Sequence, residues 1–172
     1  AYIDFVDDDF IPKISLETKN VIRMRTFSKA YGMAGLRVGY AIGEKDLILN
    51  FEKIRNHFGM SRISQVGALA ALDDYEFISN VINKVKLSRN RIAEIANNNN
   101  CKFITSFTNF VAIDCLKDSK FAKKVLENLI NNGVFVRMPY SYPQNRCIRV
   151  TVGLDKDIDL FEKYFPIALK ES

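Results

Sequence analysis

Apolar positions in the first hundred residues follow two different periods. Short runs of alternating, β-branched or aromatic residues predict strands at residues 1–6, 20–25 and 38–42. Apolar residues three and four positions apart predict helices over residues 44–58, 61–72 and 75–96. The segment 61–72 consists mostly of small and apolar residues, so we expect a buried helix there. The segment 75–96 is longer and amphipathic, which is typical of a helix that links two modules.

The pattern changes after the four consecutive asparagines at 97–100, which favour turns and helix C-caps. Beyond them the expected order is strand, strand, helix, strand, strand, helix, which is a small α+β layer unit. The strands are predicted at 102–105, 110–115, 134–137 and 147–152, and the helices at 119–132 and 158–169. We therefore expect a first module over 1–72, a linking helix over 73–99 and a small domain over 100–172.

The composition is that of a globular protein and excludes several other classes. Of the 172 residues, 48% are hydrophobic and 26% are charged, which does not fit a disordered, collagen-like or low-complexity chain. No apolar run approaches the roughly 18 residues of a membrane span. The first residues lack the basic flank and apolar core of a signal peptide. We expect no membrane partner.

The cysteine and histidine content limits which metal sites and disulfides the chain can form. The chain has three widely spaced cysteines, Cys101, Cys115 and Cys147, and the single histidine His57. Neither the number nor the spacing fits a zinc site or a disulfide framework. We therefore expect no metal, and a reducing cytoplasm as the compartment.

The net charge of +5 raises the question of an anionic partner. Lys84, Lys86, Arg89 and Arg91 recur at helical spacing, which is typical of a solvated helix face. The sequence shows no zinc finger, no aromatic pattern of an RNA-recognition strand and no glycine-rich loop that clamps RNA. We therefore expect no nucleic-acid partner, an expectation that strongly salt-dependent binding to DNA or RNA would reverse.

The stretch from 26 to 40, between the second and third predicted strands, carries the most chemistry. Thr26 and Ser28 can donate hydrogen bonds to an anion, and Arg37 can bind a phosphate through two parallel hydrogen bonds. Partial desolvation between the strands would make the Lys29 amine a nucleophile. An amine nucleophile beside a phosphate site is what a phosphorylated aldehyde cofactor requires. The alternative is structural: a surface lysine, and an arginine in a salt bridge.

The same stretch resembles a known family. Ser28-Lys29 followed by Gly-Leu-Arg-Val-Gly-Tyr at 35–40 resembles the lysine motif of fold-type I pyridoxal-phosphate aminotransferases. The string Arg-Thr-Phe-Ser-Lys-Ala-Tyr-Gly at 25–32 is most similar to the histidinol-phosphate aminotransferases and their relatives. Segments 106–110, 133–137 and 149–153 resemble further elements of that family. The resemblance implies an α/β fold, the C-terminal part of an aspartate aminotransferase-like transferase, with the end of the large cofactor-binding domain over 1–72 and the small α+β domain over 100–172.

The resemblance implies pyridoxal 5′-phosphate as the cofactor. It makes Lys29 the catalytic residue, as the Schiff-base lysine and as the group that moves a proton between the substrate Cα and the cofactor C4′. It implies that Tyr2 hydrogen-bonds the phenolic oxygen of the cofactor ring. Ser28 and Arg37, with Thr26 as a further candidate, would hold the cofactor phosphate.

Substrate-binding residues are implied in the second half of the chain. The resemblance makes Arg149 the partner of the substrate's acidic group, Arg137 a second anion-binding arginine and Asn109 a further substrate-binding residue. Independently, an unpaired arginine on the apolar strand around Arg149 would be costly to bury, which favours an anionic partner.

The implied reaction is transamination, with histidinol phosphate and 2-oxoglutarate as the substrates, in histidine biosynthesis. The resemblance also implies a homodimer. An aromatic amino-acid aminotransferase or a related pyridoxal-phosphate decarboxylase would share the same lysine and arginine framework, so both stay alternatives.

The resemblance also implies parts that lie outside this sequence. The aspartate that pairs with the ring nitrogen would come just before Ala1, and the glycine-rich phosphate loop earlier still. We therefore expect the chain to be about the C-terminal half of an aminotransferase and to be inactive alone. A truncated, non-catalytic binding module is the alternative from another class.

Overall fold

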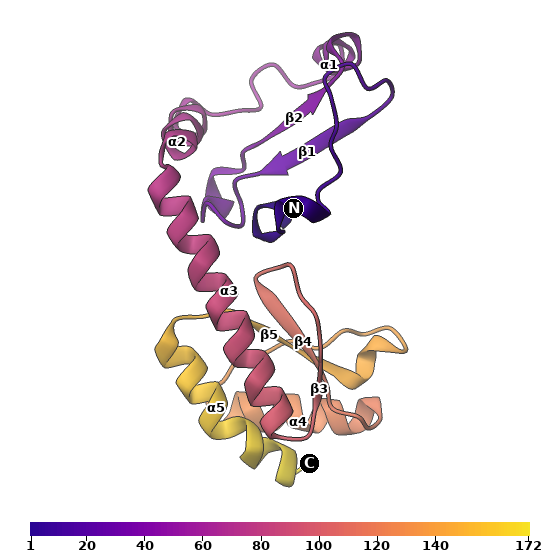
Figure 1. Cartoon of the computed structure of the whole chain (residues 1–172), viewed down its shortest axis with the longest axis vertical. Coiled ribbons are helices and arrows are strands. Elements are labelled where there is room, and N and C mark those ends of the chain that lie inside the picture. The colour runs from indigo at the N-terminus through magenta and orange to yellow at the C-terminus, as the bar shows by residue number, and fades with distance from the viewer. The chain divides into compact units, whose positions relative to one another are not determined.

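The chain folds into two compact units. A computed structural model describes residues 1–172, and the units are Ala1–Ile82 and Asn83–Ser172 (Figure 1). The boundary between them falls inside helix α3 (Tyr75–Asn98), within the segment 73–99 that the sequence pattern predicts as a linking helix. No helix of the chain is both long enough and apolar enough to cross a membrane.

The first unit is built on a two-stranded antiparallel sheet. Strand β1 (Ile22–Thr26) pairs with β2 (Gly39–Gly43), with Met24 opposite Ala41 and Thr26 opposite Gly39. The register brings the two ends of the intervening loop together, because Thr26 precedes that loop and Gly39 follows it. A short 3₁₀ turn, η3 (Ala34–Leu36), lies within the loop.

Two helices follow this sheet. Helix α1 (Lys45–Glu52) is shorter than the predicted 44–58, because the chain turns at Asn56, whose side chain accepts a hydrogen bond from the Phe58 N–H over 3.0 Å. Such a local side-chain bond competes with helix continuation. Helix α2 (Arg62–Asp73) starts at the N-cap Ser61, whose side chain accepts from the Ser64 N–H.

The predicted strand over 1–6 is wrong. The structure has a 3₁₀ turn there, η1 (Ile3–Phe5), and a second one, η2 (Asp8–Phe10), follows. The Phe5 and Val6 N–H groups donate to the carbonyls of Tyr2 and Ile3, at 3.0 and 3.1 Å. The backbone groups are therefore satisfied locally, and no strand pairs with this segment.

Helix α2 occurs where it is predicted, but the expectation that it is buried is wrong. Its only buried residue is Ser64, whereas the side chains of Val66 and Leu69 are 69% and 66% exposed. A small apolar helix becomes buried only when a second layer covers it, and the first unit packs only one side of α2.

The second unit has a three-stranded antiparallel sheet in the order β3-β4-β5. Its strands are β3 (Lys102–Ile104), β4 (Phe110–Asp114) and β5 (Cys147–Thr151), and its helices include α4 (Ser119–Asn131) and α5 (Asp155–Lys170). The 3₁₀ turn η4 (Gln144–Arg146) precedes β5. Apolar side chains of the sheet and helices form one buried cluster, in which Ile92, Ile113, Leu129, Ile148 and Phe165 are fully buried.

The predicted strand over 134–137 does not form. Only one residue pair, Arg137 with Arg149, bridges this segment to β5, and Phe135 is 74% exposed. Pro139 follows closely and has no N–H to continue a ladder. The segment therefore runs along β5 as an edge with a single point of pairing.

Candidate active site

The loop between β1 and β2 holds its shape through a buried anchor and its own backbone. Phe27 and Ala30 are each 2% exposed, and the Phe27 N–H donates to the Val38 carbonyl over 3.2 Å. The Gly32 N–H donates to the Lys29 carbonyl over 2.9 Å, with φ of +68° at Gly32, a conformation that glycine adopts without steric cost. The loop therefore has a defined backbone conformation, which fixes the Cα positions from which its polar side chains extend.

Two hydroxyls stand at the start of this loop. Thr26 Oγ1 donates to Ser28 Oγ over 3.0 Å and accepts from the Ser28 N–H over 3.1 Å. Because the Ser28 oxygen accepts in that pair, its own proton is left to donate elsewhere. The Ser28 hydroxyl is therefore a half-buried donor, as an anion-binding role requires.

Lys29 carries an amine with no acidic partner. It forms no ion pair, and its Nζ lies 5.3 Å from the centroid of the Tyr2 ring. The structure thus brings Tyr2 and Lys29 together. The expectation of a partly desolvated lysine is wrong for this chain, because Lys29 is exposed on the surface of the first unit.

Arg37 has an unusual backbone conformation. Its φ and ψ are +51° and +49°, in the left-handed region that an arginine seldom adopts. Its Nη1 donates to the Ala34 carbonyl over 2.7 Å, and it forms no ion pair. A guanidinium has five N–H donors, so most of them remain for an anion. Ser28 and Arg37 flank the hydrogen bond between Phe27 and Val38.

An ion pair with a buried carboxylate joins the N-terminal segment to β1. Asp4 and Arg25 are 3.0 Å apart, and the side chain of Asp4 is 8% exposed. Burial raises the pKa of Tyr31, and the negative charge of Asp4 raises it further, so the phenol keeps its proton. The ring of Tyr31 packs on Phe27, with 4.9 Å between centroids. The pair holds β1 against the N-terminal segment. The sequence alone does not show this role, because it depends on which residue Arg25 contacts in the fold.

In the second unit, the bridge between Arg137 and Arg149 sets two guanidinium side chains next to each other. The two residues exchange backbone hydrogen bonds, Arg137 N–H to Arg149 O at 3.1 Å and Arg149 N–H to Arg137 O at 2.6 Å. Residues paired directly in an antiparallel bridge point their side chains to the same face. Their neighbours Val136, Ile148 and Val150 are buried on the opposite, core face.

Neither arginine has a carboxylate partner. Arg149 stacks on Phe110, with 4.9 Å from its Cζ to the ring centroid, and its Nε is buried with no hydrogen-bond partner. A buried donor without a partner is costly, and an anion at this point would satisfy it. Asn109 is half-buried at the end of the β4–β5 ladder, where its carbonyl accepts from the Val152 N–H over 2.9 Å.

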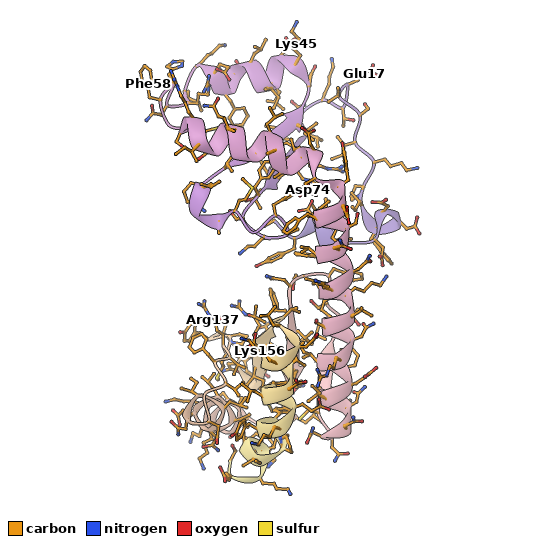
Figure 2. The ribbon with its side chains drawn as sticks, turned by 90° about the vertical axis from the view of Figure 1, so that its left-hand side faces the viewer. Glu17, Lys45, Phe58, Asp74, Arg137 and Lys156 are labelled. Carbon is orange, nitrogen blue, oxygen red and sulfur yellow. The ribbon has the colours of Figure 1, made fainter.

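A cavity of about 820 Å³ opens at this edge of the second unit. Three cations and no carboxylate are among its lining residues, with Lys123 from α4 joining Arg137 and Arg149. The aromatic ring of Tyr140 and the side chains of Leu126 and Ile130 line the rest, among others. Figure 2 labels Arg137 in this part of the chain. The lining therefore favours an anion with an apolar portion.

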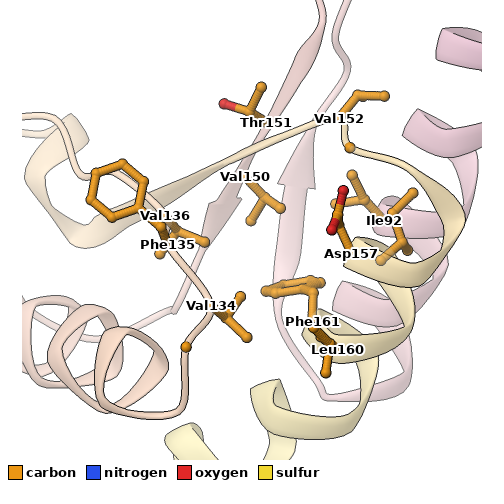
Figure 3. A pocket seen from close by; sticks show the side chains of 13 residues that line it. Ile92, Val134, Phe135, Val136, Val150, Thr151, Val152, Asp157, Leu160 and Phe161 are labelled. Carbon is orange, nitrogen blue, oxygen red and sulfur yellow. The ribbon is translucent and has the colours of Figure 1, made fainter.

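A second cavity of about 360 Å³ lies between the 133–136 segment, β5 and α5 (Figure 3). Its lining is mainly apolar, with Val134, Val150 and Phe161 facing it. Its one acid, Asp157, already accepts a hydrogen bond from the Leu154 N–H over 2.9 Å as the cap of α5. No group of histidine, cysteine or acidic residues in the chain is arranged to hold a metal ion.

The predicted site residues therefore fall into two groups, each described within its own unit. Tyr2, Thr26, Ser28, Lys29 and Arg37 belong to the first unit, and Asn109, Arg137 and Arg149 to the second. The first group has an amine, hydroxyls and a guanidinium, and the second has two unpaired guanidiniums. An amine with anion donors around it is the chemistry of a transferase that handles a phosphorylated aldehyde.

Comparison with known proteins identifies the family. The family model for aminotransferase class I and II matches residues 1–160. Histidinol-phosphate aminotransferase of Caldicellulosiruptor saccharolyticus is 36% identical over 174 residues, which cover 99% of this chain and 47% of the relative. That of Bacillus velezensis is 38% identical over 156 residues, covering 89% of this chain and 42% of the relative. The chain belongs to the aminotransferase class I and II family.

A solved structure shows the same fold. The histidinol-phosphate aminotransferase of Sinorhizobium meliloti, in complex with pyridoxal-5′-phosphate, is 42% identical, with a TM-score of 0.93 over 99% of this chain and 47% of that one. The family and the fold class that the lysine motif predicts are thereby confirmed. The chain spans about half the length of the relatives it matches.

Proposed function

We propose that this chain is part of a pyridoxal-phosphate-dependent aminotransferase that transfers the amino group between histidinol phosphate and 2-oxoglutarate. The observation that carries the proposal is the Lys29 amine, which has no counter-charge and stands in one loop with the Ser28 hydroxyl and the Arg37 guanidinium. The similarity to histidinol-phosphate aminotransferases, of which the Sinorhizobium meliloti protein binds pyridoxal-5′-phosphate, supports it.

The donors of the first unit fit a phosphorylated cofactor. Ser28 keeps a hydroxyl proton to donate because its oxygen accepts from Thr26, and Arg37 has no carboxylate to neutralise it. Gly32 and Gly35 leave open space where a side chain would project, so a ligand can approach the loop backbone. When bound, pyridoxal phosphate supplies an electrophilic aldehyde carbon and an electron-accepting ring.

Several residues of the chain would bind the cofactor, and one of them would also transfer a proton. Lys29 would hold the cofactor through its amine and, once released, would move a proton between the substrate Cα and the cofactor C4′. Ser28 and Arg37, with help from Thr26, would hold the phosphate, and Tyr2 would orient the ring through its phenolic oxygen. The 5.3 Å from the Lys29 Nζ to the Tyr2 ring supports this assignment.

The arginines of the second unit support an anionic substrate. Arg137 and Arg149 leave the same face side by side, and the buried Nε of Arg149 has no partner in the chain. We propose that Arg149 binds the carboxylate or phosphate of the substrate and that Arg137, with Asn109 nearby, adds a second anion contact. Two adjacent guanidiniums suit a ligand with a phosphate or with two carboxylates.

Two related reactions share this framework. An aromatic amino-acid aminotransferase would use the same lysine and Arg149, and a pyridoxal-phosphate decarboxylase differs only in which bond at Cα breaks. An L-threonine-O-3-phosphate decarboxylase of Porphyromonas gingivalis has the same fold at 21% identity and a TM-score of 0.73. We keep histidinol phosphate as the substrate because the similar proteins of Caldicellulosiruptor saccharolyticus, Bacillus velezensis and Sinorhizobium meliloti bear that name.

We also propose a cytoplasmic homodimer as the working form of the protein. Three free cysteines fit a reducing compartment. The homodimer is an expectation from the family resemblance.

Reductive labelling of the full-length protein tests the cofactor site. The protein is mixed with pyridoxal phosphate and treated with borohydride, and the modified peptide is mapped by mass spectrometry. We expect one label, on Lys29, and transaminase activity that Lys29→Ala abolishes while an exposed-lysine control, Lys45→Ala, keeps it. Labels scattered over surface lysines would favour the non-catalytic binding module. Activity within a few-fold of wild type in Lys29→Ala would overturn the assignment.

The substrate is tested separately by comparing donors on the same preparation. We expect kcat/KM for histidinol phosphate to exceed that for aromatic amino acids by at least about tenfold, since a lost charged contact costs about that factor or more. Carbon dioxide release without transfer of the amino group would instead establish the decarboxylase.

A further inference from the structure

Ser64 is an unusual polar residue in the first unit. It is 4% exposed, and it is the one polar residue of the first unit that is buried as a whole residue. Its Oγ donates to the Leu36 carbonyl over 2.6 Å, across 28 positions of sequence. The sequence pattern gives no sign of this bond, because Ser64 stands in a helix of small residues where any serine fits.

The hydroxyl of Ser64 is held in one orientation from the helix side. The N-cap Ser61 lies 2.8 Å from it, oxygen to oxygen, and accepts the Ser64 N–H over 3.0 Å. Since the Ser64 hydroxyl gives its only proton to Leu36, it accepts from Ser61. The start of α2 is thereby connected to the loop through a chain of two hydroxyls.

The packing around this bond is close. A Cβ added to Gly67, one turn further along α2, would lie 3.1 Å from the Leu36 Cδ1 and 3.2 Å from the Met33 Cε. Helix α2 therefore approaches the loop closely enough that Ser64 reaches a backbone carbonyl with a side chain of only two heavy atoms.

The carbonyl that Ser64 binds belongs to the peptide unit that precedes Arg37. A peptide unit is planar, so fixing the Leu36 oxygen also fixes the direction of the Arg37 N–H. That direction defines the left-handed φ of +51° at Arg37, from which the guanidinium leaves the loop. Without the bond from Ser64, only the long 3.4 Å hydrogen bond from the Arg37 N–H to the Ala34 carbonyl would hold this peptide, and Arg37 could relax to the favoured right-handed or extended region.

We propose that Ser64 is a positioning residue for Arg37, and that its hydroxyl sets how tightly the site holds the phosphate of its cofactor. This inference rests on the proposed function, in which Arg37 binds that phosphate. Ser64 itself touches neither cofactor nor substrate; it acts through the Leu36–Arg37 peptide.

The test compares two ligands that differ only in the phosphate. In the full-length protein, the dissociation constants of pyridoxal phosphate and of pyridoxal are measured for wild type and Ser64→Ala. We expect Ser64→Ala to weaken pyridoxal phosphate binding about 3- to 10-fold, the effect of one misplaced hydrogen-bonding group, and to leave pyridoxal unchanged. The control Ser79→Ala, an exposed serine of α3, changes neither value.

A double-mutant cycle separates positioning from general stability. In an Arg37→Gln background, we expect Ser64→Ala to have no further effect on pyridoxal phosphate binding, because its effect passes through the arginine. Weakening of both ligands alike, or independent losses in the double variant, would make Ser64 merely structural and overturn the inference.

The outcomes also distinguish this inference from the proposed function. If wild type prefers pyridoxal phosphate to pyridoxal and Ser64→Ala keeps the full preference, the phosphate site stands and the role of Ser64 is wrong. If wild type binds both ligands equally, the proposed phosphate site fails, and the inference fails with it.

Discussion

Arg149 lacks partners within the chain for part of its guanidinium group. Its guanidinium stacks on Phe110, its Nε is buried without a partner, and the adjacent Arg137 repels it. A structural arginine at such a place would have an acid or a carbonyl to bind. A substrate anion supplies what is missing, so the role of Arg149 can be separated from a packing role by experiment.

We expect Arg149→Ala to raise KM for 2-oxoglutarate about 10- to 100-fold, the range of a lost charge-assisted hydrogen bond. The dissociation constant of pyridoxal phosphate should stay within a few-fold of wild type, because the proposed phosphate contacts come from the loop between β1 and β2. The measurements are steady-state kinetics and a cofactor titration. Arg91→Ala, which removes a surface arginine paired with Asp159 and Glu162, is the control. Equal losses for substrate and cofactor would contradict the assignment.

The thiol of Cys115 should make the stability of the folded chain depend on pH. Burial raises the pKa of its thiol from the ordinary value of 9.0 to about 12, and the nearby thiols of Cys101 and Cys147 add to the shift. Between those two values the unfolded chain loses the proton and the folded chain keeps it, so the free energy of unfolding falls as pH rises. The slope from one such group is about 1.4 kcal/mol per pH unit.

Urea denaturation at pH 8 and at pH 10.5 checks this expectation. Wild type should lose more stability over that interval than Cys115→Ala, which has no thiol to titrate, although the variant starts less stable because it leaves a small cavity. Below pH 9 the difference between the two proteins should be constant. Parallel pH curves over the whole range would show that the thiol does not control the slope.

The residues of the site differ in how far the sequence predicts them. Ser28, Lys29 and Arg37 stand in one short stretch, so residue types alone indicate their chemistry. The sequence pattern does not indicate Ser64, because its role depends on a carbonyl 28 positions away. The exposure of Lys29 could not be predicted either, because it depends on what the rest of the unit packs around the loop.

At the scale of elements, the pairing of β1 with β2 depends on one glycine. A Cβ at Gly39 would lie 2.5 Å from the Arg25 carbonyl oxygen and 3.4 Å from the Thr26 Cα, both backbone atoms that cannot move without separating the strands. We expect Gly39→Ala to destabilise the first unit by about 1–3 kcal/mol, the usual cost of forcing atoms into a filled space. Denaturant titration measures it.

Gly35 offers a matched control in the same motif. A Cβ there would meet nothing within 4 Å, and its φ lies outside the left-handed region, so Gly35→Ala should change stability by only a few tenths of a kcal/mol. If both variants lose the same stability, the motif requires its glycines for another reason than the approach of the strands.

Element prediction succeeds where periodicity and packing agree. Helices α4 and α5 follow their predicted ranges closely, and α5 continues through Pro166, because their apolar residues face a large shared core. The segments 1–6 and 134–137 have strand-like side chains but almost no strand partner, so local turns or a single bridge replace the predicted strands. Strand propensity describes how a residue fits a sheet, and a sheet needs a neighbour.

At the scale of the whole molecule, the two units bury very different amounts of apolar surface. The cluster from Ile92 to Ala168 lies wholly within the second unit. The first unit buries few side chains, namely Phe5, Phe27, Ala30, Val38 and Ser64. Large apolar residues of the first unit are instead exposed, among them Ile54 at 81% and Phe58 at 95%. Phe58 is labelled in Figure 2.

Local stability follows buried apolar contacts, so the 172-residue chain should not open uniformly. In hydrogen–deuterium exchange followed by mass spectrometry, we expect amides of β4, β5, α4 and α5 to be protected at least about a hundredfold more than those of α1 and residues 53–60. The reason is that opening the second unit exposes the whole buried cluster, whereas opening α1 exposes little that is not exposed already. Leu129→Ala, which leaves a cavity in that cluster, should reduce protection throughout the second unit and leave α1 unchanged. Equal protection of both units in the wild-type chain would mean that the first unit is stabilised by something other than the burial of its own side chains.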